Sequence, residues 1–171
     1  MSSYGVASEF YFGTPAEKTR WVLRTGAASG DNPGTENYEG YVFNRNYDIA
    51  FLMFNHPMGQ KDFFKTSLQR DDSKAVDTAL DDEALSNVFY LSPQIHWQWT
   101  DKVTLVNTVT WAKLNANPID GLNVDKNVGM EWDVSLNYKP LERVTWNTQL
   151  GVLLPGAMFK ADTLNYDTST A

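Results

Sequence analysis

The residues best suited to chemistry are two carboxylates, Glu131 and Asp133, in a stretch where apolar and polar residues alternate. Residues two positions apart on a β-strand point to the same face, about 6–7 Å apart. Carboxyl groups at that distance could act as the acid and base of glycoside cleavage. The wet wall of a channel explains the same spacing, and we expect the protein not to be an enzyme.

The histidines offer little catalytic or metal-binding chemistry. His96 falls on the same alternating face as Ser92, as in a base and nucleophile pair, but no third group is identifiable to orient the imidazole. His56 and His96 have no ligand partner at helical or hairpin spacing, and the chain contains no cysteine. We therefore expect no metal site and no cofactor.

The charge and composition narrow the class of protein. The formal net charge is −7, with no basic cluster, which argues against a nucleic-acid partner. No apolar run approaches the roughly 20 residues of a transmembrane helix. Aromatic residues make up 13% of the chain, with six Trp and eight Tyr, the two types that gather at membrane interfaces. Soluble carbohydrate-binding sandwiches are rich in aromatic residues as well.

Alternation with a period of two indicates strands in six stretches. These are residues 4–13, 19–28, 88–99, 103–111, 128–138 and 144–154. The most regular is 128–138, where Val128, Met130 and Trp132 begin an apolar face and Glu131 and Asp133 lie on the other. A tilted strand of about ten residues crosses the hydrocarbon of a bilayer. The pattern is typical of a transmembrane β-barrel with a polar lumen, or of half-solvated strands in a soluble sandwich.

The connections differ in length, and the aromatic residues follow them. Residues 14–18, 100–102 and 139–142 form short connections and the others are long, as in outer-membrane barrels with short periplasmic turns. Large aromatic residues cluster near the short connections. We predict that they form a girdle at the periplasmic interface, made of Trp21, Trp97, Trp99, Tyr138 and Trp146.

The polar residues of the same strands are candidates for lining a lumen. A charged and amide-rich wall would set which solutes pass. The predicted lumen-lining residues are Arg20, Arg24, Gln94, His96, Gln98, Glu131, Asp133, Asn147 and Gln149.

Residues 29–87 are predicted to begin and end on the outer side of the membrane. They form either one insertion, which folds into the lumen as a plug, or an insertion with an extra hairpin near residues 39–54. Residues 47–54 are apolar on both faces and fit a buried strand or a short buried helix. A helical turn is expected near residues 75–80. The chain then has six or eight strands, and because six cannot close a barrel, we expect a segment of a larger barrel or further strands from another chain.

Two motifs carry a resemblance to a known family. The strand that breaks into TGAASGDNPG at residues 25–34, followed by FNRNYD at 43–48, resembles outer-membrane porins of the alginate-export type over residues 19–55. The resemblance implies a large single-chain barrel that passes polysaccharide or small polar solutes through an arginine-rich lumen. Here Arg20 and Arg24 face Glu9, Glu131 and Asp133, which argues against an anionic, alginate-like substrate.

These observations predict an all-β chain in one domain, residues 1–171. We expect an antiparallel transmembrane barrel of six to eight strands, with residues 29–87 as an outer-side insertion. The expected location is the outer membrane of a Gram-negative bacterium, with membrane lipid as partner. The expected function is porin-like, passive passage of small polar solutes or saccharides. The alternative is a soluble carbohydrate-binding β-sandwich module.

Overall fold

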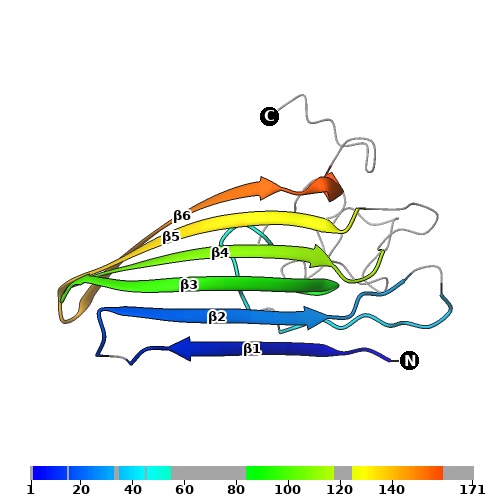
Figure 1. The fold of residues 1–171 in the computed structure, drawn as a ribbon, viewed down its shortest axis with the longest axis horizontal. Helices are drawn as coiled ribbons and strands as arrows, with labels where there is room; N and C mark the ends of the chain where they lie inside the picture. Colours follow the sequence, from blue (N-terminus) through cyan, green and yellow to red (C-terminus); the bar gives the residue numbers. More distant parts are fainter. Residues whose placement is uncertain are drawn as a thin grey trace.

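The chain forms one antiparallel sheet of six strands, in sequence order from β1 to β6 (Figure 1). The computed structural model describes residues 2–14, 16–32, 35–44, 46–54, 84–117 and 125–159. The elements are β1 (Gly5–Phe12), β2 (Thr19–Ala28), β3 (Val88–Thr100), β4 (Val103–Leu114), β5 (Asn127–Leu141), β6 (Val144–Pro155) and the short 3-10 helix η2 (Ala157–Phe159).

The all-β prediction is confirmed, and the six predicted strands are present with small changes of boundary. β5 runs three residues further than expected, so the turn into β6 is residues 142–143 rather than 139–142. β3 and β4 are likewise joined by a two-residue turn, residues 101–102. The short turns lie together at one end of the sheet and the long connections at the other (Figure 1).

The sheet is open rather than closed into a barrel. β1 and β6 are its two edges, and each pairs with one neighbour only among the described residues. Six strands are fewer than the eight of the smallest bacterial barrels, so they are too few to close on themselves. No described residue belongs to a helix long and apolar enough to cross a membrane.

The cross-strand register gives the sheet one apolar and one polar face. Trp111 lies opposite Met130, which lies opposite Leu154, and their apolar face continues across all six strands. The next pair, Thr110 opposite Glu131, lies on the polar face. The apolar and polar residues that alternate in the sequence therefore lie on opposite faces of the sheet, because each strand keeps its register with the next.

A β-bulge changes the start of β5. The pairing with β4 shifts between Ala112 and Lys113, and Gly129 takes a φ of +128°. A Cβ at Gly129 would lie 2.3 Å from the carbonyl oxygen of Leu154, so only glycine fits there. Val128, expected on the apolar face with Met130, is fully buried instead.

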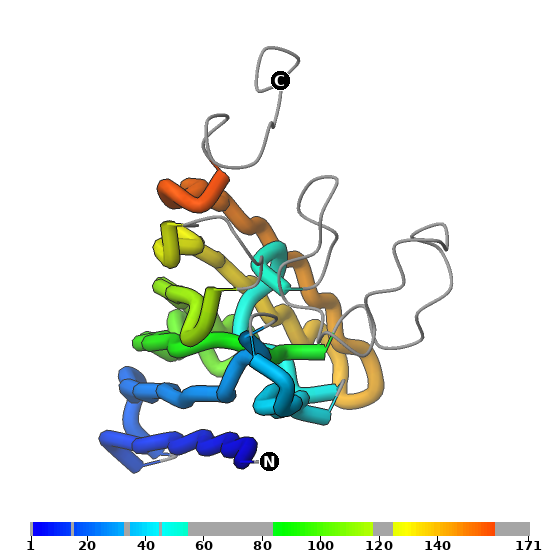
Figure 2. Tube along the Cα trace, turned by 90° about the vertical axis from the view of Figure 1, so that its right-hand side faces the viewer, coloured from blue at the N-terminus to red at the C-terminus, as the bar shows by residue number. Residues whose placement is uncertain are grey.

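Residues 41–54 cross the polar face of the sheet. In Figure 2 they form the cyan tube on one side of the strands. They contain neither of the two elements expected for residues 47–54, and the extra hairpin is also absent from the described part of residues 39–54, where Val42 makes an isolated bridge to Ser86. The segment is apolar because its side chains pack both on the sheet and on one another, and not because it forms a helix or a strand. The helical turn expected near residues 75–80 lies outside the described residues.

The hydrophobic core lies between this segment and the polar face, toward the long connections. Small residues on the strands leave room for it: Ala28 and Ala112 are fully buried. Met53 of the segment and Met158 of η2 are fully buried with them. The core thus occupies the side of the sheet that the alternation marks as polar.

Candidate functional site

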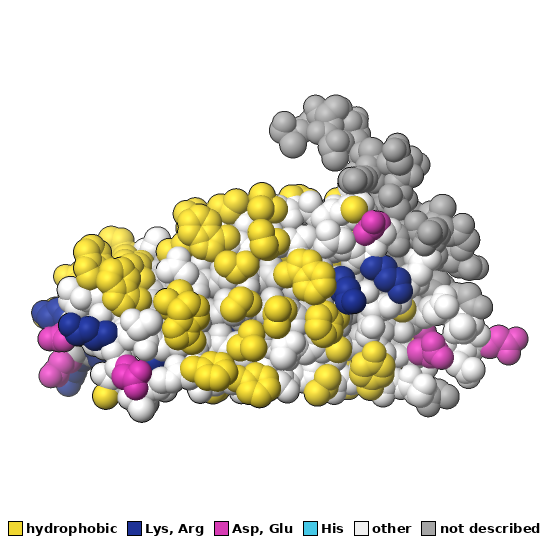
Figure 3. Space-filling model, viewed as in Figure 1, with side chains coloured by type: hydrophobic (Ala, Val, Ile, Leu, Met, Phe, Trp, Pro, Cys, Tyr) yellow, Lys and Arg dark blue, Asp and Glu magenta, His cyan; other side chains and the backbone are white. Residues whose placement is uncertain are grey.

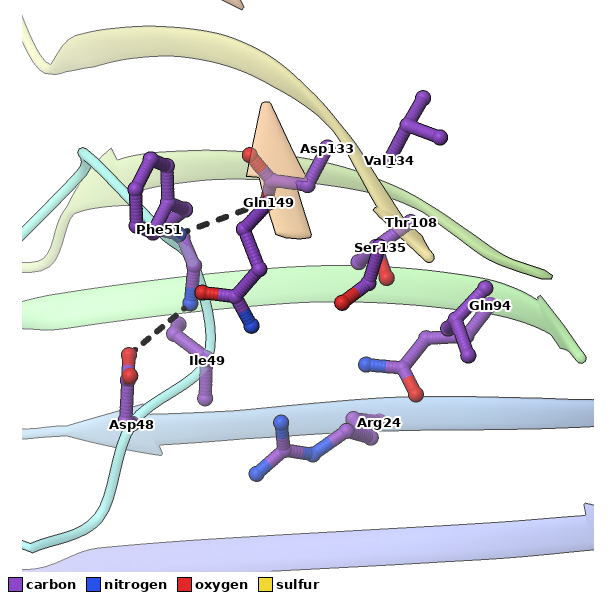
Figure 4. Close-up of a pocket in the computed structure, with 12 residues that line it drawn as sticks. Arg24, Asp48, Ile49, Phe51, Gln94, Thr108, Asp133, Val134, Ser135 and Gln149 are labelled. Atoms are coloured by element: carbon purple, nitrogen blue, oxygen red, sulfur yellow. Dashed lines mark hydrogen bonds between the residues drawn. The ribbon is translucent and has the colours of Figure 1, made fainter. Parts of the chain in front are cut away.

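A pocket of about 220 Å³ opens between the polar face and the segment that crosses it. Its walls come from β2 to β6 and from residues 48–51 (Figure 4). Antiparallel pairing brings these strands side by side, so that residues far apart in the chain share one wall. The lining residues are Arg24, Asp48, Ile49, Ala50, Phe51, Gln94, Val106, Thr108, Asp133, Val134, Ser135 and Gln149.

Four of the nine predicted lumen-lining residues meet at this pocket: Arg24, Gln94, Asp133 and Gln149. In Figure 4 the ends of Arg24, Gln94 and Gln149 point toward a shared space, together with the hydroxyl of Ser135. Gln149 lies directly opposite Ser135 across β5 and β6. The pocket therefore presents amides, a hydroxyl and a guanidinium to one small volume.

The other five lie on the same face but outside the pocket. Arg20 lies opposite His96 on β2 and β3, nearer the short turns, where Gln98 and Asn147 also lie. Asn147 donates from Nδ2 to Oδ1 of Asn137, 2.9 Å away. The polar face therefore continues from the pocket toward the short turns as a series of amides and charges.

Glu131, the fifth, is enclosed instead of facing open solvent. It has no exposed surface, and its two carboxylate oxygens accept hydrogen bonds of 2.5 Å from the backbone N–H groups of Leu52 and Met53. The buried hydroxyl of Thr110, opposite Glu131, donates to the carbonyl oxygen of Ile49 over 3.2 Å. Glu131 and Thr110 thus fix the segment on the sheet by its backbone.

Asp133 holds the segment less firmly. Its Oδ2 accepts from the backbone N–H of Phe51 at 3.4 Å, the outer limit for a hydrogen bond. Its Oδ1 is buried and has no hydrogen-bond partner among the described residues. Gly151, opposite Asp133 on β6, provides the space: a Cβ there would lie 2.8 Å from Oδ1 and 2.9 Å from Cδ1 of Phe51.

Arg24 is positioned by contacts on two sides. Its Nε donates to Oε1 of Glu9 on β1 over 2.8 Å, and its guanidinium carbon lies 5.5 Å from the ring centroid of Tyr47. Tyr47 also shares a short hydrogen bond with the hydroxyl of Tyr90. The ion pair with Glu9 offsets the positive charge of Arg24, while the ring of Tyr47 orients the guanidinium.

The hydrolase arrangement of Ser92 and His96 does not form. Ser92 is fully buried and its hydroxyl lies 2.9 Å from that of Thr110, while Nε2 of His96 lies 3.3 Å from Oε1 of Gln94. Among the described residues, no three His, Asp or Glu side chains are grouped as a metal site would require. His56 lies outside those residues.

Sequence reasoning missed part of the pocket. Thr108 and Ser135 share the alternation of the predicted residues, so that signal could have identified them. Asp48 and Phe51 come from a segment without periodicity, and no local signal places them against the sheet.

The predicted aromatic girdle lies on the apolar face near the short turns. Trp97 and Trp99 stack with their ring centroids 6.2 Å apart, and Tyr138 lies opposite Trp146 at the start of β6. Trp21 lies close to the β1–β2 turn. Each of the five exposes more than a third of its surface.

No protein-family model, curated protein or solved structure matches the chain. The case for a function therefore rests on the two faces of the sheet and on the pocket.

Proposed function

We propose that this sheet is part of the wall of a transmembrane β-barrel that passively conducts small polar solutes or saccharides across the outer membrane of a Gram-negative bacterium. The observation that carries the proposal is the exposed apolar face. Figure 3 views the sheet from this side and shows hydrophobic side chains spread across it. Charged side chains in that view gather toward the two ends of the strands.

The size of the apolar face is the first argument. Even on the interior strands β4 and β5, Trp111 is 36% exposed and Trp132 is 49% exposed. Edge-strand residues continue the face, with Phe10 on β1 and Leu150 on β6. Soluble monomers rarely expose contiguous apolar patches larger than a few hundred Å², because each Å² in water costs about 25 cal/mol. A hydrocarbon surrounding removes this cost.

Strand length and aromatic placement support the same surrounding. The interior strands contain between 10 and 15 residues, and about 9–11 tilted residues cross a bilayer. The girdle residues Trp97, Trp99 and Trp146 lie on the apolar face at the short-turn end, where the interface would be.

The open edges support a sheet that pairs with further strands. β1 and β6 each leave one side of their backbone unpaired by described residues, and unpaired strand edges are unstable in hydrocarbon. Further strands, from a longer chain or from another chain, would complete the barrel. In that setting residues 41–54 lie inside the lumen and narrow it. The resemblance to alginate-export porins would then include the barrel architecture.

The soluble sandwich is the less favoured function. A sandwich buries its apolar face under a second sheet, but no described residue covers this face, and the covered face is the polar one.

Reconstitution tests the proposal. The protein is folded into lipid vesicles at a concentration that lets further copies of the chain supply the missing strands, and its conductance is measured in a planar bilayer under a salt gradient. We expect discrete conductance steps and swelling of vesicles in isotonic sugar. A protein that stays soluble and monomeric without detergent, and that leaves the bilayer current unchanged, would contradict the proposal.

A further inference from the structure

We infer that the pocket binds an uncharged, polyhydroxylated solute, a single sugar unit, rather than an anion or a cation. The inference rests on the proposed channel and specifies the solute class. The volume of the pocket, about 220 Å³, is below the roughly 300–1,000 Å³ of drug-sized ligand sites. One small ring therefore fits, and an oligomer passes one unit at a time.

The charges of the pocket argue against an anion. Among the described lining residues, Arg24 is the one guanidinium, and Asp48 and Asp133 are two carboxylates. Arg24 is already paired with Glu9 through its Nε. An anion would therefore meet a partly neutralised cation and two charges of its own sign.

The same contacts argue against a cation. Oδ1 of Asp48 accepts a 3.2 Å hydrogen bond from the backbone N–H of Ala50, and Oδ2 of Asp133 accepts one of 3.4 Å from Phe51, while Oδ1 of Asp133 is buried. The guanidinium of Arg24 points into the shared space. A cation in the shared space would therefore meet the positive charge of Arg24, while the carboxylate oxygen without a partner among the described residues, Oδ1 of Asp133, is buried.

What faces the space suits hydroxyl groups. Gln94 and Gln149 each offer an amide oxygen and an amide NH₂, while Thr108 and Ser135 offer hydroxyls that donate or accept. Arg24 adds donors in a fixed plane. Hydroxyl groups of a sugar both donate and accept, so a ring of them can match this mixture without any change of charge.

The experiment uses the full chain in detergent micelles and saturation-transfer NMR, with methyl glucoside, glucuronate and glucosamine as probes. We expect saturation transfer to methyl glucoside and several times less to the other two. The Gln94→Leu, Gln149→Leu double variant should bind methyl glucoside about tenfold more weakly, since it loses two amide hydrogen bonds. Gln98→Leu with Asn147→Leu, on the same face but outside the pocket, is the matched control and should bind as the unmodified protein does.

Equal signals from glucuronate, or unchanged binding by the pocket variant, would overturn the inference. If the pocket variant does not fold, the comparison of the three probes on the unmodified protein decides the inference. The two proposals fail separately: conductance without sugar binding refutes the inference alone, and sugar binding without conductance refutes the channel.

Discussion

The carboxylate of Glu131 accepts a hydrogen bond from the backbone N–H of Met53, a residue 78 positions earlier in the chain. Leu52 donates to the other oxygen of the same carboxylate. One side chain thus satisfies two successive backbone donors, and charge-assisted bonds of this kind are about twice as strong as neutral ones. This contact turns an apolar segment into a fixed part of the polar face.

The first prediction concerns this attachment. Glu131→Ala leaves the N–H groups of Leu52 and Met53 without their acceptors, at a cost of about 2–4 kcal/mol for the two. Hydrogen exchange at these two amides should therefore accelerate by about 30- to 700-fold, since each 1.4 kcal/mol is a factor of ten. Glu142→Gln, which alters an exposed carboxylate in the turn between β5 and β6, is the control. Unchanged protection at both amides would mean that Glu131 does not hold the segment.

A second prediction tests the packing of Phe51. In Gly151→Ala the new methyl group would lie 2.9 Å from Cδ1 of Phe51, so the ring must move away from β6. We expect single-channel conductance to fall, because a ring displaced from the wall projects further into the path that the segment narrows in the proposed barrel. Thr148→Ala, on the other face of β6, should conduct like the unmodified protein. Equal conductance in all three proteins would mean that residues 41–54 do not narrow the conducting path.

The third prediction concerns the two faces of β5. Val134 lies opposite Asn107 and Leu150 on the apolar face, whereas Ser135 lies opposite Val106 and Gln149. In a bilayer Val134→Arg should destabilise the folded protein by about 2–4 kcal/mol, since it places a charge in hydrocarbon. Ser135→Arg, directed to the polar face, should cost less. Denaturant titrations in lipid vesicles measure both, and equal penalties would argue for a solvated apolar face.

The aromatic residues supply the fourth prediction. Trp97, Trp99 and Trp146 lie near the short turns, while Trp132 lies within β5. In single-tryptophan variants, lipids brominated near the headgroup should quench the first three more than lipids brominated at the chain ends, and Trp132 should show the reverse. Strong quenching of all four by aqueous iodide would instead favour a soluble protein.

Ion selectivity supplies the fifth prediction and depends on burial. Glu131 is enclosed by Leu52 and Met53, so Glu131→Gln should leave the cation-to-anion permeability ratio nearly unchanged. Arg20 lies on the polar face outside the pocket, and Arg20→Gln should raise the ratio because a positive charge leaves the path. Reversal potentials under a salt gradient measure the ratio. An unchanged ratio in Arg20→Gln would show that the charge of Arg20 does not line the path.

Local sequence pattern is enough to place the six strands and their two faces. A period of two is a local property: each residue from Met130 to Tyr138 points opposite to the next because of backbone geometry alone. For the same reason, alternation alone assigns the nine candidate wall residues and the five aromatic residues to their faces. Short connections then pair β1 with β2, β3 with β4 and β5 with β6, whereas the pairing across the two long connections is decided by the sheet as a whole.

Which residues meet across the sheet depends instead on long-range packing. Residues 41–54 have no periodicity, so nothing local shows that they cross the polar face or that Glu131 binds Leu52 and Met53. Whether Val128 faces outward depends on a bulge that Gly129 permits and that the pairing with β4 imposes. Contacts between distant segments arise from the packing of the whole sheet, and a pattern along one strand carries no information about what covers it.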